Sequence, residues 1–262
     1  MGSATTQALT ATTSALAAAP SVDLGVAREL FAAVRALAGS SQLSGALSDA
    51  SAPADARQQV VTGVFGGYSP ATVAVLKAAV AERWSSAADL VSGIEEAGIR
   101  AAAIAEPSVD LEAELFSVTR TIASNPELEL ALGSRLGDSS AKGALIEALL
   151  GGRASEPTII VVSSLVQVPR ERRVRSMLGR ALSVVAEERG RIVATVSSAT
   201  ALTGDQQSRL QRTLAERYGK DVSLNLVVDP SVVGGLRIEI GDDVIDATVS
   251  SRLSDLRHRL AG

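Results

Sequence analysis

Residues 229–246 read DPSVVGGLRIEIGDDVID, and this stretch decides how the C-terminal third of the chain folds. Its middle alternates apolar and charged residues, which is the period of a strand with one buried face. Glycines precede and follow that strand, where the chain needs backbone angles that side chains disfavour. The stretch therefore predicts a hairpin. The residues expected to shape it are Asp229, Pro230, Gly234, Gly235, Gly241, Asp242 and Asp246.

The glycines and aspartates of this stretch do not form a known ligand motif. The glycines match neither GxGxxG nor GxxxxGK[ST], and no lysine follows to hold a phosphate. Asp243 and Asp246 are separated by two strand residues, so their carboxylates are not expected to converge on a metal. A structural role in turns is the preferred interpretation.

The residues before the hairpin predict a strand, a helix and another strand. Segments 191–199 and 222–228 are rich in β-branched and other apolar residues that alternate with smaller or polar ones. Between them, Thr203 and Gln206 have the spacing of a capping box, which marks a helix start. Residues 191–262 are therefore expected to form a small α+β module, with a short mixed sheet and helices.

The end of the chain has the pattern of an amphipathic helix. Apolar residues recur there at helical spacing, and arginines occupy the remaining surface. Burying four such side chains contributes about 1.5–3 kcal/mol each, so this face is expected to dock on the sheet or on a partner. The candidate partner-binding residues of this segment are Val249, Leu253, Leu256 and Leu260.

The first two thirds of the chain contain an internal repeat. The sequence PSVDL at residues 20–24 recurs at residues 107–111, and ELF at residues 29–31 recurs at residues 114–116. Further matches follow at nearly the same offset, until an insertion of five residues around positions 168–172. Two homologous units are the simplest explanation.

Both units, residues 1–106 and residues 107–190, are expected to be helical bundles. Apolar residues recur at helical spacing in each, and prolines mark helix starts at Pro70, Pro126 and Pro157. The repeat pairs Pro70 with Pro157. Short loops favour antiparallel packing, and the many alanines predict close-packed helices with little room for a cofactor. The expected fold is thus mainly α, with helical bundle units followed by the α+β module.

The composition argues against several classes of enzyme and binding protein. The chain has no cysteine and one histidine, His258, so zinc sites of several His or Cys, iron–sulfur clusters and cysteine nucleophiles lack their residues. A net charge of −4 gives no basic footprint for nucleic acid. The sequence shows neither the basic start of a signal peptide nor an apolar run of about 18 residues. We expect no catalytic residue, cofactor, metal, bound nucleic acid or membrane insertion.

One basic run, PRERRVRSMLGR at residues 169–180, leaves two interpretations open. It lacks an aromatic residue that could stack on a base, as single-strand binders typically have. A solvated helix start, or a patch for an acidic partner helix, is therefore favoured over RNA binding. Arg172, Arg173 and Arg175 are the candidate partner-binding residues of this run.

With these residues identified, the C-terminal third resembles the delta subunit of bacterial F-type ATP synthase, a relative of the mitochondrial oligomycin-sensitivity-conferring protein. The resemblance rests on VSSA at residues 196–199, LTGDQQ at residues 202–207, YGK at residues 218–220 and, above all, residues 229–246. It extends back to NPEL at residues 125–128, which is similar to a helix junction of that family.

Over roughly residues 112–260, the resemblance implies a non-catalytic subunit of the peripheral stalk, or stator, at the cytoplasmic face of the cell membrane. In that family a helical bundle binds the N-terminal tails of alpha subunits, and the C-terminal module holds the distal end of the b-subunit stalk. This link couples proton-driven rotation to ATP synthesis. The family usually has one bundle, so the two units of this chain are a departure, and residues 107–190 are expected to occupy the alpha-binding position.

Two unrelated functions are the alternatives. A helical-repeat scaffold would explain the repeat, but not the strand, helix and hairpin of the C-terminal module. An RNA-binding adaptor would explain the arginine run alone. Copurification with alpha and b subunits distinguishes the stator from both alternatives.

Overall fold

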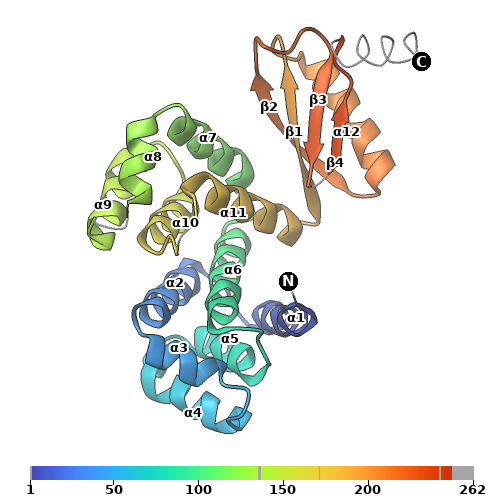
Figure 1. The fold of residues 1–262 in the computed structure, drawn as a ribbon. Coiled ribbons are helices and arrows are strands. Elements are labelled where there is room, and N and C mark those ends of the chain that lie inside the picture. The colour runs from blue at the N-terminus through green and yellow to red at the C-terminus, as the bar shows by residue number, and fades with distance from the viewer. Residues whose placement is uncertain (1, 135–136, 171, 242, 250–262) are drawn as a thin grey trace, which may run out of the picture. The chain divides into compact units, whose positions relative to one another are not determined.

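The structure is a computed structural model that describes residues 2–134, 137–170, 172–241 and 243–249. The chain divides into two compact units, Met1–Val185 and Ala186–Gly262 (Figure 1). The first is helical and the second contains a four-stranded mixed sheet, which confirms the expected fold class. The division of the helical part at residue 106 stays a prediction.

Side chains just before the helices fix several helix starts in the first half of the helical unit. Asp23, Ser40, Ser69 and Ser86 each accept a hydrogen bond from a backbone N–H in the first turn of the helix that follows. The helices of this half are α1 (Ser3–Ala17), α2 (Leu24–Gly39), α3 (Ser41–Ser48), α4 (Ala54–Phe65), α5 (Pro70–Ala81) and α6 (Ala87–Ala105).

The second half repeats these elements in order and nearly in length. Asp110 caps the first helix as Asp23 caps α2, so the repeated PSVDL sequence is a helix start. Pro126 and Pro157 lie in the first turns of their helices, as expected. The helices are α7 (Leu111–Ala123), α8 (Pro126–Gly133), α9 (Ser139–Leu150), α10 (Glu156–Gln167) and α11 (Val174–Glu188).

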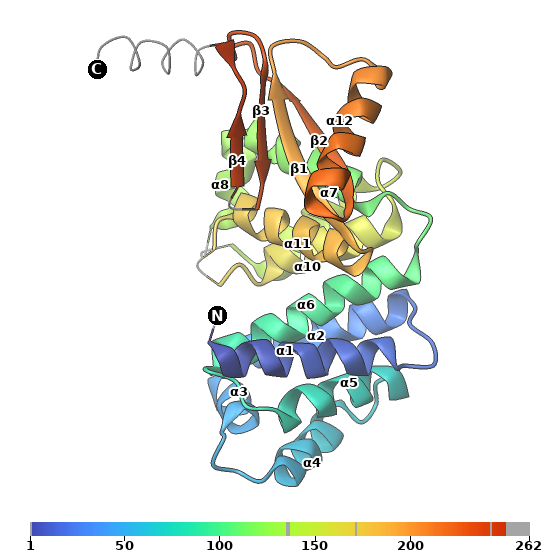
Figure 2. The same ribbon diagram turned by 90° about the vertical axis from the view of Figure 1, so that its right-hand side faces the viewer.

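Helix α6 belongs to two bundles at once. It packs against α1, α2, α3 and α5, and it also packs against α10 (Figure 2). Its Glu96 forms an ion pair with Arg180 in α11. In chain order, α6 follows α5 as α11 follows α10, and it precedes α7 as α1 precedes α2. The first bundle is therefore α1–α6 and the second is α6–α11.

A partly buried, hydrogen-bonded carboxylate joins α2 to the start of α5. The carboxylate of Glu29 accepts hydrogen bonds from the Ser69 backbone N–H at 3.0 Å and from the Ser69 hydroxyl at 2.6 Å. The Thr72 hydroxyl donates a third bond at 2.6 Å. One side chain thereby satisfies donors at the first turn of α5, which have no partner within the helix.

The same arrangement recurs in the second bundle, between α7 and the start of α10. Glu114 accepts hydrogen bonds from the backbone N–H of Ser155 at 2.9 Å and from its hydroxyl at 2.7 Å. The Thr158 hydroxyl donates at 2.5 Å. The two bundles therefore share a contact as well as a sequence pattern.

These contacts correct the expected register of the repeat by one residue. They align Ser69 with Ser155, so Pro70 corresponds to Glu156, and Pro157 lies one position further into its helix. Proline is tolerated at both positions because the first-turn N–H groups need no helical acceptor. The origin of the two bundles by duplication stays a hypothesis.

The C-terminal module is a sheet whose inner face is covered by one helix. Its strand order is β2-β1-β3-β4, with β1 and β2 parallel and the other neighbours antiparallel. Ala194, Val196, Leu214, Val222 and Ile238 form the centre of its core. The elements are β1 (Arg191–Ser198), α12 (Gly204–Tyr218), β2 (Asp221–Val228), β3 (Leu236–Ile240) and β4 (Asp243–Asp246).

The capping box expected at Thr203 is present. Its hydroxyl accepts from the Gln206 backbone N–H, and the Gln206 side chain accepts from the Thr203 backbone N–H. Gly219 ends the helix with a φ of +66°, a conformation that glycine adopts without strain. The expected hairpin of β3 and β4 is also present.

Strand β2 departs from the simple alternation that its sequence suggested. Val222 is buried, but Val228, at the last position of the strand, is exposed. Asn225, which was expected on the polar face, is buried. The alternation thus identified the strand correctly but not the burial of each residue, because the burial of a strand residue depends on its neighbours in the folded sheet.

Candidate interaction sites

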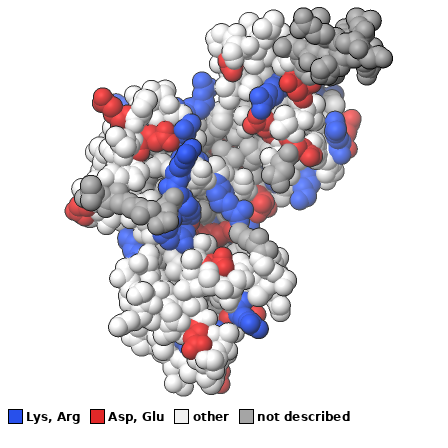
Figure 3. All heavy atoms as spheres, in the orientation of Figure 1, with Lys and Arg blue, Asp and Glu red and all other residues white. Residues whose placement is uncertain are grey.

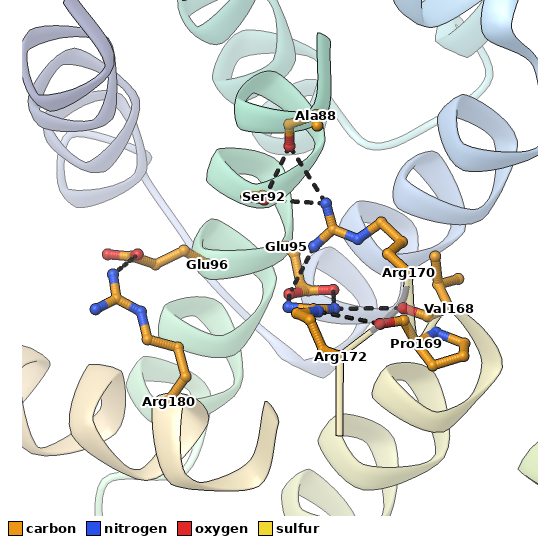
Figure 4. A network of polar contacts seen from close by, with 9 residues as sticks. All are labelled: Ala88, Ser92, Glu95, Glu96, Val168, Pro169, Arg170, Arg172 and Arg180. Atoms are coloured by element: carbon orange, nitrogen blue, oxygen red, sulfur yellow. Dashed lines mark hydrogen bonds and ion pairs between the residues drawn. The ribbon is translucent and has the colours of Figure 1, made fainter. Parts of the chain in front are cut away.

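Two adjacent carboxylates of α6, Glu95 and Glu96, are the most buried acidic pair that joins the two bundles. Arg172 holds Glu95 with two parallel hydrogen bonds, from Nη1 to Oε1 at 2.6 Å and from Nη2 to Oε2 at 2.9 Å (Figure 4). Arg170 adds an ion pair to the same Oε1 at 3.1 Å. Only 7% of the Glu95 side chain is exposed, so these contacts replace its solvent.

Arg170 has an unusual backbone and an extended set of partners. Its φ is +46°, which non-glycine residues rarely adopt. Its Nη1 donates to the Ser92 hydroxyl at 3.0 Å and to the Ala88 carbonyl at 3.3 Å (Figure 4). Burial lowers the pKa of Arg170, and the Glu95 carboxylate opposes that effect. The backbone therefore turns so that the guanidinium reaches α6.

Glu96 has a separate set of arginine partners. It pairs with Arg100 one turn along α6 at 2.7 Å, and with Arg180 of α11 at 2.7 Å. Glu95 and Glu96 therefore attach α6 to two consecutive parts of the second bundle, the segment before α11 and α11 itself. We call Glu95, Glu96, Arg170, Arg172 and Arg180 the inter-bundle cluster.

The basic run is thus largely turned toward the protein itself. Arg172 serves the inter-bundle cluster, and Arg175 pairs with Glu129 at the surface at 2.9 Å. Arg173 is exposed at the start of α11. Figure 3 shows basic side chains gathered around α10 and α11, whereas the visible face of the first bundle is mostly uncharged. A partner-binding role for these three arginines stays a prediction; Arg173 and Arg175 are exposed, and Arg172 is partly buried.

The hairpin of the C-terminal module is built by turn residues. Asp229 accepts from the Ser231 hydroxyl at 2.7 Å and from its backbone N–H at 2.9 Å. These bonds lower the pKa of Asp229, and bonds from Thr248 lower the pKa of Asp246 in the same way. Pro230 lies in the same turn. The carboxylates therefore hold turns, as the sequence indicated.

The glycines of the hairpin have the backbone angles that were expected. Gly234, Gly235 and Gly241 have φ values of +65°, +81° and +57°. At Gly235 a side chain is also excluded, since a Cβ atom there would lie 2.3 Å from the Ala247 carbonyl oxygen. Asp242 lies outside the described residues. The glycine pattern therefore reflects backbone geometry.

Of the closing apolar face, only Val249 lies within the described residues. It is partly exposed, and its backbone N–H donates to the Gly234 carbonyl at 3.1 Å. Leu253, Leu256 and Leu260 lie outside the described residues, so their partner-binding role stays a prediction.

Sequence reasoning did not foresee an open groove in the second bundle, which we call the α7–α9 groove. It lies between α7 and α9, begins at the start of α8 and has a volume of about 970 Å³. Close packing of small residues was expected to leave little space in either bundle. Its lining is mainly apolar and also includes Glu114, Glu127 and Arg153.

No group of three or more His, Cys, Asp or Glu residues suited to a metal ion occurs within the described ranges. The network of Glu95 and Glu96 uses its carboxylates in ion pairs, and Glu29 and Glu114 use theirs at helix starts. These arrangements hold helices together.

Comparison with known proteins identifies the family. A family model described as "ATP synthase delta (OSCP) subunit" matches residues 96–260. The ATP synthase subunit delta of Leifsonia xyli subsp. xyli is 48% identical, with 100% of both chains covered. Those of Nocardia farcinica and Streptomyces avermitilis are 41% and 39% identical, each covering 94% of this chain and 93% of the relative. The chain belongs to the ATP synthase delta (OSCP) family.

This delta-family chain is a non-catalytic subunit of the peripheral stalk of F-type ATP synthase, as the resemblance implied. The family match supports neither an unrelated scaffold nor an RNA-binding adaptor. It starts inside α6, so it spans most of the second bundle and the C-terminal module. The relative from Leifsonia aligns along the whole chain, so the alignment includes the residues of the first bundle as well.

None of the helices in the described part of this delta subunit has the length and apolar character needed to cross a bilayer.

Proposed function

We propose that this subunit connects the N-terminal tails of alpha subunits to the distal end of the b-subunit stalk, so that proton-driven rotation is coupled to ATP synthesis. The observation that carries the proposal is the division into a helical unit and a separate α+β module, where the family match covers the second half of the helical unit and the module. A subunit with two such units can hold two partners. Its place would be the cytoplasmic face of the cell membrane, through the complex.

The second bundle, α6–α11, is the part we assign to the alpha subunits. The family match covers most of it and excludes α1–α5. Its surface also carries exposed large apolar side chains, with Leu130 exposed on α8, and Leu145 and Leu149 exposed on α9. Such residues favour a protein interface.

The C-terminal module is the part we assign to the b subunit. Four valines of this small domain are exposed, two at strand positions and two in connecting segments. They are Val228, Val233, Val244 and Val249. Because the module has a separate core beneath α12, these valines are available to a partner without disturbing that core.

A reconstitution with the catalytic head, stripped of its own delta subunit, tests both assignments. A chain that lacks residues 1–85 keeps α6, and we expect it to bind the head with affinity within a few-fold of the full chain. A chain that ends after Gly190 should still bind the head but lose the soluble part of b. Complete loss of head binding on removal of residues 1–85 would contradict the assignment of the second bundle.

A further inference from the structure

The connector between α10 and α11, residues 168–173, reaches back onto the first turns of α6. Nη1 of Arg170 donates to the Ser92 hydroxyl at 3.0 Å and to the Ala88 carbonyl at 3.3 Å, and its Nη2 pairs with Glu95 at 3.1 Å (Figure 4). These contacts hold a segment of the second bundle against the helix that both bundles share.

Three features of Arg170 oppose this position. Its φ of +46° is the one positive value among the described residues other than glycine. Its Nε is buried and has no hydrogen-bond partner within the described part of the chain. Burial also lowers the pKa of its guanidinium, which disfavours the charged form. Strain and an unsatisfied buried donor both cost free energy, so the contacts with α6 are what keep Arg170 in place.

Arg172 decides what happens to Glu95 when Arg170 leaves. The Glu95 side chain is almost fully buried, and a buried carboxylate without a partner is strongly unfavourable. Arg172 alone supplies two parallel charge-assisted hydrogen bonds to this carboxylate, at 2.6 and 2.9 Å. Departure of Arg170 therefore leaves no buried charge without a partner.

The first bundle has the same corner, but without charge or strain. Its connector between α5 and α6, residues 82–86, returns to α1, where the Ser85 N–H donates to the Thr5 hydroxyl at 3.3 Å and that hydroxyl donates to the Ser85 hydroxyl at 2.9 Å. Trp84 in this connector is buried, and its Nε1 donates to the Ala79 carbonyl at 2.7 Å. No residue of this connector has a positive φ. The strained, ionic corner is thus a property of the second bundle.

We propose that residues 168–173 form a latch with two states. In the closed state, shown in Figure 4, Arg170 lies on α6. In the open state its backbone relaxes to a negative φ and its guanidinium turns to solvent, while Arg172 keeps Glu95. Opening loosens the joint between the two bundles without unfolding either of them. The inference concerns this chain alone and does not depend on which subunits it binds.

Trp84 is a natural reporter of the open state. It is the one tryptophan of the chain, and with Ser92 and Arg172 it lines a hollow of about 200 Å³ beside the latch. Arg170→Ala removes the closed state, so it should raise the acrylamide quenching constant of Trp84 about twofold and speed amide exchange of residues 88–96 about fivefold or more. The urea midpoint of the full chain should stay close to that of the original, because strain is lost together with the contacts.

Arg173→Ala is the matched control. It removes the same charge from the same connector, but Arg173 is exposed and makes no hydrogen bond or ion pair with α6 in the described part of the chain. Quenching and amide exchange should therefore remain as in the original chain. Unchanged quenching and exchange in Arg170→Ala as well would overturn the latch.

Arg170→Gly distinguishes a latch from a rigid corner. In a latch the backbone relaxes in both variants, so the glycine variant should be no more stable to urea than Arg170→Ala. In a rigid corner the φ of +46° would persist, and alanine would be strained there whereas glycine would not. A clearly higher urea midpoint for Arg170→Gly than for Arg170→Ala would overturn the proposal.

A double-mutant cycle tests the part of Arg172. Each of Arg170→Ala and Arg172→Met leaves Glu95 with one arginine, whereas the double variant removes both. The loss of urea midpoint in the double variant should therefore exceed the sum of the two single losses. Additive losses would show that Arg172 does not make the release of Arg170 possible, and would overturn the two-state latch.

Discussion

At Glu29 and Glu114, burial raises the pKa of the carboxylate, but hydrogen bonds from a serine and a threonine outweigh it and leave the pKa lowered. Hydrogen bonds that are donated to a carboxylate favour its ionised form. A group with a lowered pKa stabilises the folded chain above its unfolded pKa, about 4.3 for glutamate, and this contribution is lost as the pH falls through the folded pKa.

Replacement of both residues by glutamine should therefore change the response of the helical unit to acid. We expect Glu29→Gln with Glu114→Gln to lower the free energy of unfolding at pH 7 by about 1.5–3 kcal/mol per site, since charge-assisted hydrogen bonds are lost. The loss of stability below about pH 4.5 should be smaller than in the original chain. Urea unfolding at pH 7 and pH 4 measures both effects, and an unchanged acid response would contradict the assignment.

Gly235 gives a second prediction at a single residue. A Cβ atom there would meet the Ala247 carbonyl oxygen at 2.3 Å, and the φ of +81° is strained for alanine. Gly235→Ala should destabilise the C-terminal module by about 2 kcal/mol or more, through strain and displaced backbone. Hydrogen exchange of residues 191–249 in the full chain reports the effect on that module. Gly204→Ala, where nothing lies within 4 Å, is the control and should have little effect.

Among single residues, the sequence predicted those whose role is local. The capping box of Thr203 and the turn bonds of Asp229 involve neighbours two or three positions away, so spacing reveals them. Glu95 pairs with Arg172, which lies 77 residues away in the sequence, and a pattern of neighbouring residues cannot reveal such a pair. The basic run therefore suggested an external partner, whereas the structure turns Arg172 inward.

At the scale of elements, the inter-bundle cluster makes the segment before α11 part of the contact with α6. The insertion that breaks the repeat lies around Arg170 and Arg172. Both side chains reach Glu95 on the shared helix. An irregularity of the repeat thus supplies the contact that joins the bundles.

Loss of the Glu95 charge should destabilise the folded chain, because Arg170 and Arg172 would lose the carboxylate with which they pair. We expect Glu95→Gln to reduce the free energy of unfolding by about 3 kcal/mol, the scale for removing one partner of a buried ion pair. The exposed pair of Arg28 and Glu156, whose side chains are 52% and 63% exposed, gives the control. Glu156→Gln should cost less than about 1 kcal/mol.

Urea unfolding followed by circular dichroism compares these two variants. Trp84, the one tryptophan of the chain, is buried beneath Gly93 of α6, so its fluorescence reports on the first bundle and on α6. Equal stability of the two variants would show that the inter-bundle cluster does not contribute as its burial indicates.

The elements themselves were predicted well where their signals are local. Helix starts at prolines and at the capping box of Thr203, and the strands of the C-terminal module, appear in the structure as expected. The register of the repeat differed by one residue at Pro157, because a proline can occupy either of the first helical positions. The α7–α9 groove was missed because an open site depends on the volumes of residues that meet only after folding.

At the scale of the molecule, α6 makes the two bundles interdependent. A cut at residue 106, where the repeat suggests a boundary, removes α6 from the second bundle together with Glu95 and Glu96. A cut before Ser86 retains the helix and its capping residue. The sequence repeat and the structural unit therefore have different boundaries, because one helix serves both bundles.

Two shortened chains test this interdependence. The chain of residues 86–262 should unfold cooperatively and keep the helical content of the second bundle. The chain of residues 107–262 should lose much of that content, since α10 loses the helix on which it packs and Arg180 of α11 loses its ion-pair partner. Circular dichroism and thermal unfolding compare them. Equal cooperativity and midpoints in both chains would show that the second bundle does not need α6.

The most direct test of the stator assignment is photo-crosslinking within the intact complex in native membranes. A photoreactive amino acid replaces Leu149 in the second bundle, Val244 in the C-terminal module or, for comparison, Val64 in the first bundle. We expect Leu149 to capture an alpha subunit and Val244 to capture b, while Val64 captures no alpha subunit. Capture of alpha from Val244, or from Val64 but not from Leu149, would contradict the assignment of the two units.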